Sequence, residues 1–272
     1  MRSERVIGQE LQKAMRYDHQ PSLLTIRFAR RQADASLYAD GRLSATARAG
    51  FAPMVRRMLG LDQPVEAFED ALGAHPLIGA TIANQRGLRV PQTTSPFEAL
   101  TWAITGQQIS VSAAVSIRRR MIEASASAHS SGLLCYPDPE RVIALGEERL
   151  RGAGFSETKA RALLALAHGV ADKQIALDQW LATEPLPVEA IRDGLLALRG
   201  VGAWTVNYSL LRGFGWMDGS LHGDVAVRQG MRQILGLAET PNEEACRRWL
   251  EEFSPWRALV AAHLWAVRKV KA

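Results

Sequence analysis

Hydrophobic residues recur with a helical period through most of the chain, but the first quarter is patterned differently. Two runs there, residues 23–29 and 35–39, are rich in strand-forming residues and predict a pair of strands. Residues 1–20 are polar and charged, so we expect them to begin as a helix or to remain poorly ordered. Helical patterns follow at residues 51–59 and 64–72. The pattern therefore predicts a small α+β lobe at the start of the chain.

From Leu77 onward nearly every segment has the three- and four-residue spacing of an amphipathic helix. The Ser95-Pro96 pair is typical of a helix start, with a capping serine before a first-turn proline. The predicted helices lie at residues 97–104, 111–122, 139–145, 147–153, 157–170, 187–198, 241–252 and 255–270. We expect a mainly α fold with two parts, the α+β lobe over residues 1–75 and a helical domain over residues 76–272.

A pair of glycines interrupts the helical pattern at Gly200-Val201-Gly202. Ile191 and Leu195 belong to a helix before this break, and Trp204 belongs to a helix after it. Two helices joined in this way form a helix-hairpin-helix, because glycine lets the backbone turn sharply and approach a ligand closely. The free N–H groups at the start of the second helix can hold a phosphate. The alternative is a tight turn between helices that binds nothing.

A polar, glycine-rich segment, residues 213–223, follows and ends at Asp224. Asp224 opens another amphipathic helix, and Asp is a common N-cap, so capping alone would account for it. A carboxylate at this point could also stabilise a developing positive charge or activate water. Asp218 is the rival carboxylate of the segment, and we expect it to be a surface loop residue.

Composition sets limits on the classes of protein that remain possible. The 272-residue chain has a formal net charge of +5, which suits a polyanionic partner but is weak evidence by itself. Cys135 and Cys246 are too few for a disulfide framework, a zinc site or a four-cysteine iron–sulfur cluster. The chain has no signal-peptide pattern and no apolar run of about 18 residues. We therefore expect a cytoplasmic protein that needs no cofactor and has no membrane partner.

Three motifs in this order resemble the HhH-GPD superfamily of base-excision DNA glycosylases. They are the Gly-Val-Gly hairpin, the glycine-rich segment that ends at Asp224, and Pro-Trp-Arg-Ala-Leu-Val-Ala-Ala-His-Leu-Trp at residues 255–265. Within the superfamily the chain looks most like the AlkA type, 3-methyladenine DNA glycosylase II. The resemblance covers residues 75–268 well and implies a helix-hairpin-helix glycosylase fold with two helical subdomains. It also implies an N-terminal sheet domain like half of a TATA-binding protein, of which this chain keeps only the later part.

The resemblance implies an activity on duplex DNA that contains alkylated bases. Such an enzyme turns the damaged nucleotide out of the helix and hydrolyses its N-glycosidic bond, here with Asp224. Bifunctional members carry a lysine at the position of Trp204, so its absence implies a monofunctional glycosylase. The resemblance further implies a monomer that acts in the cytoplasm at the nucleoid. Two alternatives remain, a glycosylase for 8-oxoguanine or hypoxanthine and a non-enzymatic DNA-binding module.

The resemblance also assigns residues to the base pocket and to the DNA wedge. Trp204, Tyr208 and Trp265 would surround the everted base, since a cationic alkylated purine stacks well on aromatic faces. The alternative for these three residues is a place in the core. Gln108 would be the wedge that fills the gap in the duplex, where the best-known relative has a leucine. The alternative for Gln108 is a solvated loop residue.

The hairpin completes the site that the resemblance implies. Backbone N–H groups of Gly200, Val201 and Gly202 would hold a DNA phosphate without reading sequence. The backbone carbonyls of Leu198 and Val201 would hold a monovalent cation, Na⁺ or K⁺. We expect the Arg118–Arg120 run to form a solvated helix face. We expect His222 to be a loop residue.

Overall fold

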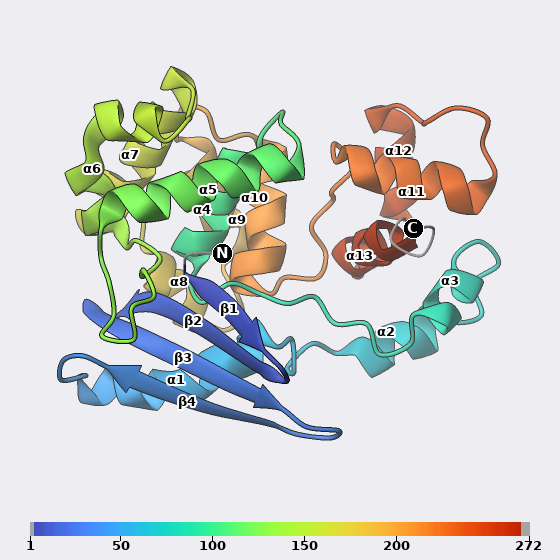
Figure 1. Ribbon diagram of the computed structural model, residues 1–272. Coiled ribbons are helices and arrows are strands. Elements are labelled where there is room, and N and C mark those ends of the chain that lie inside the picture. The colour runs from blue at the N-terminus through green and yellow to red at the C-terminus, as the bar shows by residue number, and fades with distance from the viewer. Residues whose placement is uncertain (1–2, 268–272) are drawn as a thin grey trace. The chain divides into compact units, whose positions relative to one another are not determined.

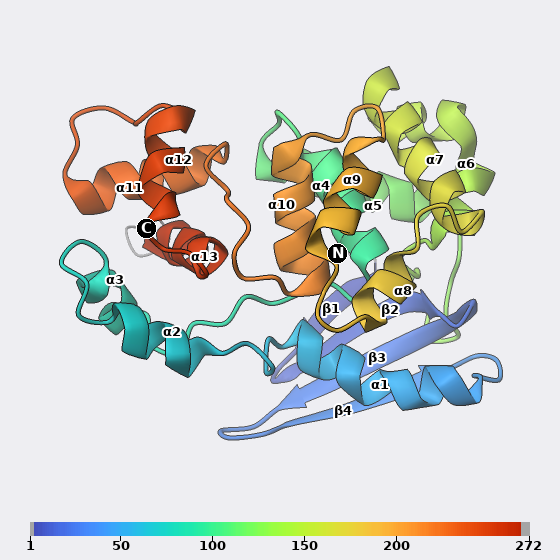
Figure 2. The same ribbon diagram turned by 180° about the vertical axis from the view of Figure 1, so that it is seen from behind.

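The computed structural model describes residues 3–267, which form two compact units. Within the described residues, unit 1 is made of residues 3–55 and Leu100–Val201, and unit 2 of Arg56–Ala99 and residues 202–267. The chain therefore passes between the units three times, the last time inside the Gly-Val-Gly hairpin. The sequence predicted a domain boundary between residues 75 and 76. The two units are each made of two separate stretches of chain, so they do not test this boundary, which stays a prediction. Figures 1 and 2 show the elements of the two units.

Unit 1 holds a sheet and most of the helices. Its elements are β1 (Glu4–Ile7), β2 (Glu10–Tyr17), β3 (Gln20–Phe28), β4 (Ala33–Ala39), α5 (Val111–Ser125), α6 (Pro139–Gly152), α7 (Glu157–Ala171), α8 (Leu177–Ala182) and α9 (Val188–Leu196). Unit 2 contains α2 (Val65–Leu72), α3 (Gly79–Asn84), α10 (Ala203–Ser209), the π-helical turn η1 (Leu210–Phe214), α11 (Val225–Leu235), α12 (Glu243–Glu251) and α13 (Arg257–Val267). Two helices, α1 (Ala45–Met58) and α4 (Pro96–Gly106), cross from one unit to the other. The mainly α fold class is confirmed.

The sheet is a four-stranded antiparallel meander in the order β1-β2-β3-β4. Side chains that alternate along β3, among them Leu24 and Ile26, are fully buried, as period-2 burial of a sheet face requires. Helix α1 lies against one face of this sheet, where the Tyr17 hydroxyl donates to the carbonyl of Ala47 at 2.7 Å (Figure 2). The buried face of the sheet thus contributes to the interior of unit 1, which the sheet shares with residues 100–201.

The expectation that residues 1–20 form a helix or stay poorly ordered is wrong, because these residues supply β1 and β2. The charges that hid the strand pattern are paired inside the fold. Lys13 is buried, and its ammonium lies 2.6 Å from a carboxylate oxygen of Glu4. Arg16 forms an ion pair with Asp138, which lies far along the sequence. A charged residue that is neutralised by a distant partner can occupy a strand position that its polarity alone would exclude.

Three helices of unit 1, α5, α6 and α7, begin at the predicted residues 111, 139 and 157, whereas the sequence did not predict α8. Ser110, Asp138 and Ser156 are side-chain N-caps of α5, α6 and α7, each accepting a backbone N–H of the first turn. Within α6 the backbone leaves the helical region at Gly146, with φ 66° and ψ 176°. The predicted separation into helical segments on either side of this residue is therefore confirmed. No helix among residues 3–267 is long and apolar enough to cross a membrane.

Unit 2 is organised around α13, which packs against α3, α11 and α12. Seven of its consecutive residues, from Ala258 to Leu264, are buried. The contact with α11 is unusually close, because a Cβ atom on Gly230 would lie 2.6 Å from the Leu264 carbonyl oxygen. Only glycine lets the two backbones approach this closely. This contact fixes the start of α11 relative to the end of α13, and these are the segments that carry Asp224 and Trp265.

His263 is a buried titratable group in this core. Its ring stacks on Phe68 with centroids 5.2 Å apart, and neither ring nitrogen has a hydrogen-bond partner within the described residues. Burial lowers the pKa of His263 to about 4, although the nearby Glu69 opposes this effect. The folded protein therefore holds a neutral imidazole over most of the accessible pH range.

We expect His263 to make the protein acid-sensitive. Its pKa in the unfolded chain is near 6.5, so between pH 6.5 and about 4 the unfolded chain binds a proton that the folded chain does not. Stability that is present above pH 6.5 should fall by about 3 kcal/mol as the pH approaches 4. In His263→Phe this part of the pH dependence should vanish. Guanidinium titrations at several pH values measure it, with His168→Gln, at an exposed histidine, as the control. An unchanged pH slope in His263→Phe would contradict the assignment.

Candidate active site

Asp224 ends the glycine-rich segment and caps helix α11. Its Oδ1 atom accepts the backbone N–H groups of Ala226 at 2.8 Å and Val227 at 3.1 Å. The N-cap role is therefore confirmed. The same carboxylate also accepts two indole N–H groups, from Trp204 to Oδ2 at 3.1 Å and from Trp265 to Oδ1 at 3.2 Å. Capping and a place beside the aromatic residues are thus combined in one side chain.

The two oxygens of Asp224 have different surroundings. Each carboxylate oxygen offers about two acceptor sites. Oδ1 receives three N–H groups, from Ala226, Val227 and Trp265, whereas Oδ2 receives one, from Trp204. All four of these partners are N–H donors, so the carboxylate acts only as an acceptor in these contacts. The hydrogen bonds of Oδ1 hold α11 and Trp265 in place. Oδ2 accepts only one N–H group, so it has a second acceptor site for water or for a positive charge.

Three aromatic rings gather beside this carboxylate within unit 2. Trp204 and Tyr208 lie one turn apart on α10, with ring centroids 5.3 Å apart and planes tilted by 31°. Tyr208 lies 6.2 Å from the ring of Trp265 on α13. All three rings are half-buried. Each packs against the core of the unit, as the alternative of a core position requires, and part of each ring stays exposed. The structure brings the predicted pocket residues together with Asp224, while their role in binding a base stays a prediction.

Asp218 does not have the surface position that we expected. Its side chain is 14% exposed and forms an ion pair with Arg257, with Nε to Oδ1 at 2.7 Å. It also accepts the Ser254 hydroxyl at 3.0 Å. Asp218 therefore ties the glycine-rich segment to the start of α13 through its ion pair with Arg257. His222 is a half-buried loop residue that is hydrogen-bonded to Ser220 at 2.9 Å, and burial lowers its pKa.

The two hairpin glycines differ in whether the fold requires a glycine at their position. Gly200 has φ +90°, and a Cβ atom there would lie 3.1 Å from the Cβ of Ala162. Gly202 has φ −106° and ψ 176°, which any residue can adopt, and a Cβ there would meet nothing within 4 Å. Gly200 is therefore required by the turn itself, whereas nothing in the described fold requires Gly202. Close approach of a ligand would account for a glycine at such an exposed position.

The proposed wedge residue lies on the turn between α4 and α5, in unit 1. Gln108 is exposed and has φ +55°, an uncommon backbone conformation for a residue with a side chain. Two apolar neighbours, Ile109 and Val111, are also exposed, Val111 by 73%. An exposed turn with apolar flanks is a plausible shape for insertion between bases, and the wedge role of Gln108 remains a prediction.

Sequence reasoning missed two charged groups in unit 1. Arg118 is not a solvated residue: it is 7% exposed, lies 2.9 Å from Glu4, and stacks over the ring of Tyr136 at 4.9 Å. Lys159 on α7 donates to two backbone carbonyls, Thr105 at 2.9 Å and Gln107 at 2.6 Å. Neither lies in a recognisable motif, because each finds its partners far along the sequence.

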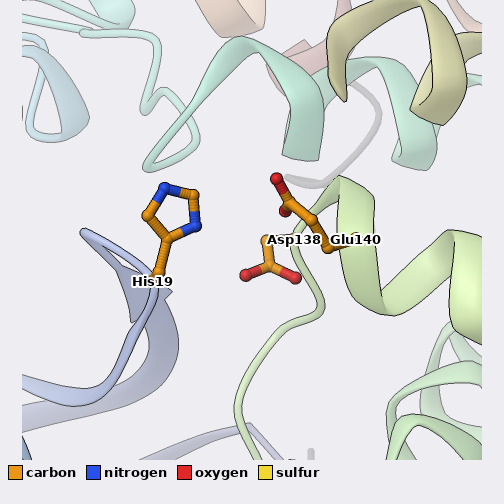
Figure 3. Close-up of side chains that lie close together, drawn as sticks. All are labelled: His19, Asp138 and Glu140. Atoms are coloured by element: carbon orange, nitrogen blue, oxygen red, sulfur yellow. The ribbon is translucent and has the colours of Figure 1, made fainter. Parts of the chain in front are cut away.

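Among residues 3–267, the side chains of His19, Asp138 and Glu140 lie close enough together to offer ligand atoms to a metal ion (Figure 3). Asp138 is already engaged, since Oδ1 caps α6 through the N–H of Arg141 and Oδ2 pairs with Arg16. The other two side chains approach from a strand turn and from the first turn of a helix. These contacts explain the position of Asp138 without an ion, so we assign no metal site to this group.

The fold and this site define a class of protein. A helix–Gly-Val-Gly–helix turn followed by an Asp-capped helix, with an N-terminal antiparallel sheet, is characteristic of helix-hairpin-helix base-excision proteins. Residues 101–255 match the model of the HhH-GPD superfamily base excision DNA repair protein, and residues 2–95 match that of the AlkA N-terminal domain. The chain therefore belongs to the HhH-GPD superfamily.

Named relatives agree with this assignment. The chain is 30% identical over 190 residues to "DNA-3-methyladenine glycosylase 2" of Escherichia coli, covering 69% of this chain and 63% of that protein. It is 31% identical over 234 residues to the "Probable bifunctional transcriptional activator/DNA repair enzyme AlkA" of Mycobacterium tuberculosis, covering 82% of this chain and 42% of that protein. The chain thus spans less than two thirds of the length of these relatives. The structure of a 3-methyladenine DNA-glycosylase from Archaeoglobus fulgidus has the same fold, with a TM-score of 0.79, 19% identity, and coverage of 98% and 90%.

The contrast between the hairpin glycines leads to a prediction about stability. Gly200→Ser places a side chain at positive φ against Ala162 and should cost about 1–2 kcal/mol. Gly202→Ser should be neutral or slightly stabilising, because serine is a better N-cap for α10 than glycine. Thermal unfolding of both variants beside the wild type measures the difference. Equal losses of Tm would show that the backbone conformation does not distinguish these positions.

Proposed function

We propose that this chain is a monofunctional DNA glycosylase that removes alkylated purines, such as 3-methyladenine and 7-methylguanine, from duplex DNA. The observation that carries the proposal is the carboxylate of Asp224, which Trp204 and Trp265 hold while Oδ2 keeps an acceptor site. Membership in the HhH-GPD superfamily supports the reaction class. The names of the relatives from E. coli and A. fulgidus support the substrate class.

The chemistry follows from the charge that develops on the sugar. As the bond between base and sugar breaks, its electrons leave with the base, and the sugar becomes positively charged. Oδ2 of Asp224 would stabilise this charge and accept a proton from the water that attacks the anomeric carbon. An alkylated purine already carries a positive charge, so it departs as a neutral base without an acid to protonate it. A site with one carboxylate is therefore sufficient for this substrate class.

The absence of lyase activity is part of the proposal. A lyase needs an amine that attacks the sugar and forms a Schiff base. Trp204 occupies the position where bifunctional members have that lysine, and its N–H is engaged with Asp224. No lysine occurs among the described residues of unit 2, the unit to which Asp224 belongs. Water is then the nucleophile.

Substrate selection would come from the aromatic rings. Trp204 and Tyr208 are already at stacking distance from each other, so an incoming base must stack on an outer ring face rather than between them. An electron-poor, cationic purine gains from such a face both by stacking and by cation–π attraction, with each stack contributing about 1–3 kcal/mol. An uncharged, undamaged purine gains less, which favours the damaged base.

DNA would be held by the hairpin and opened by the wedge. The absence of a structural reason for Gly202 supports close approach of a phosphate at this point. Gln108 would fill the space that the everted nucleotide leaves. A monovalent cation on the carbonyls of Leu198 and Val201 remains part of the proposal. The Leu198 carbonyl accepts the N–H of Val201 at 3.0 Å, which leaves it one further acceptor site for such an ion. We expect a monomer that acts at the nucleoid in the cytoplasm.

The experiment that tests the function is mass spectrometry of bases released from methylated duplex DNA. We expect 3-methyladenine and 7-methylguanine in the supernatant and an intact abasic strand that breaks only on treatment with alkali. Duplexes with single 8-oxoguanine or hypoxanthine residues serve as the comparison. Release of an oxidised base without release of methylpurines would contradict the substrate class. Tight DNA binding without any release would indicate a non-enzymatic module.

Asp224→Asn separates catalysis from capping. The amide oxygen can still accept the N–H groups of α11, but the amide NH₂ then faces a donor, the indole of Trp204. We expect base release to fall on the order of 100- to 10,000-fold. The free energy of unfolding should fall by only about 1–3 kcal/mol. Single-turnover release and thermal unfolding measure the two effects. Normal turnover in this variant would refute the catalytic role of Asp224.

A further inference from the structure

Lys159 caps the end of a helix that leads to the proposed wedge. The last carbonyls of any α-helix lack partners within the helix. At the end of α4 the ammonium of Lys159 donates hydrogen bonds to two of these carbonyls. Its Nζ lies 2.9 Å from the Thr105 oxygen and 2.6 Å from the Gln107 oxygen. A positive charge at a helix C-terminus is also favoured by the helix dipole. The lysine is half-buried, and burial lowers its pKa, so the fold accepts a desolvation cost to place a cation here.

The same turn is linked directly to the hairpin. The side-chain amide of Gln107 donates to the Gly200 carbonyl, with Nε2 to O at 2.9 Å. Gly200 is the residue that makes the hairpin turn possible, through its positive φ. Both residues belong to unit 1, so this hydrogen bond is internal to one compact body. The main chain of Gln107 is thus fixed by Lys159, and its side chain is fixed by the hairpin.

Gln108 is held between these anchors in a strained conformation. A left-handed conformation at a non-glycine residue is energetically unfavourable and persists only where its surroundings determine it. On the other side of the turn Ser110 caps α5 through the N–H of Ala113. The turn is therefore fixed before Gln108 by Lys159 and after it by Ser110, and Gln108 itself is left exposed.

We propose that Lys159 and Gln107 are positioning residues that fasten the Gln108 turn to the Gly200 hairpin. The binding of a phosphate at the hairpin and the insertion of Gln108 then take place on one preassembled surface. A wedge on a loose turn would have to become ordered at the moment of insertion. The entropy cost of that ordering would reduce the binding free energy available to open the duplex. This inference rests on the proposed function, in particular on the wedge role of Gln108.

The test compares two DNA substrates in the same protein sample. One duplex carries 7-methylguanine opposite cytosine, and the other carries it opposite an abasic site, where there is no base pair to open. In Lys159→Met we expect single-turnover release from the paired duplex to fall about tenfold or more, because two charge-assisted hydrogen bonds are lost. Release opposite the abasic site should fall less than about threefold. The ratio of the two rates does not depend on the fraction of folded protein.

Lys173→Met is the matched control, since it removes one exposed positive charge from the same unit and should leave both rates unchanged. A double-mutant cycle gives the second readout. Because Lys159 acts through the Gln108 turn, Lys159→Met should cause little further loss in a Gln108→Ala background.

The outcomes separate the inference from the function on which it rests. Wild-type protein that releases no base from either duplex would refute the proposed function. With an active wild type, an equal loss on both duplexes in Lys159→Met would overturn the inference, because it would show that Lys159 does not act on the opening of the base pair. Full additivity with Gln108→Ala would also overturn it.

Discussion

The site depends on the convergence of four N–H groups on one carboxylate. Two come from the first turn of α11 and two from the indoles of Trp204 and Trp265, so Asp224 joins α10, α11 and α13. The convergence requires α11 and α13 to pack at a distance that Gly230 alone permits. One residue therefore completes a helix, orients two aromatic rings and keeps one oxygen available for chemistry.

The two compact units carry different parts of the proposed function. Unit 2 contains the carboxylate and the aromatic cluster, where selection and hydrolysis of the base would take place. Unit 1 contains the turn of Gln108 and the hairpin glycine Gly200, which would act on the DNA backbone and the base stack. The Asp224 cluster and the Gln108 turn are each held by hydrogen bonds within their own unit. Such bonds keep side chains in a fixed geometry before a substrate binds.

Features with a local physical cause could be predicted from the sequence. The hairpin, the Asp224 cap, the break at Gly146 and the helix starts at Ser110 and Ser156 follow from glycine conformation and N-cap chemistry. Features that depend on distant partners could not. They are β1 and β2 with their neutralised charges, buried Arg118, the Asp218–Arg257 pair, and Lys159 bound to the carbonyls of Thr105 and Gln107. Their side chains look solvent-facing until the fold supplies the opposite charge or carbonyl.

The most direct test of the central claim is the ¹⁵N–¹H NMR spectrum of the tryptophan indoles, of which the chain has seven. The signals of Trp204 and Trp265 can be assigned by replacing each tryptophan with phenylalanine. The account predicts that these two N–H protons exchange slowly and that only these two shift strongly in Asp224→Asn. Rapid exchange at both indoles, with no response to Asp224→Asn, would contradict it.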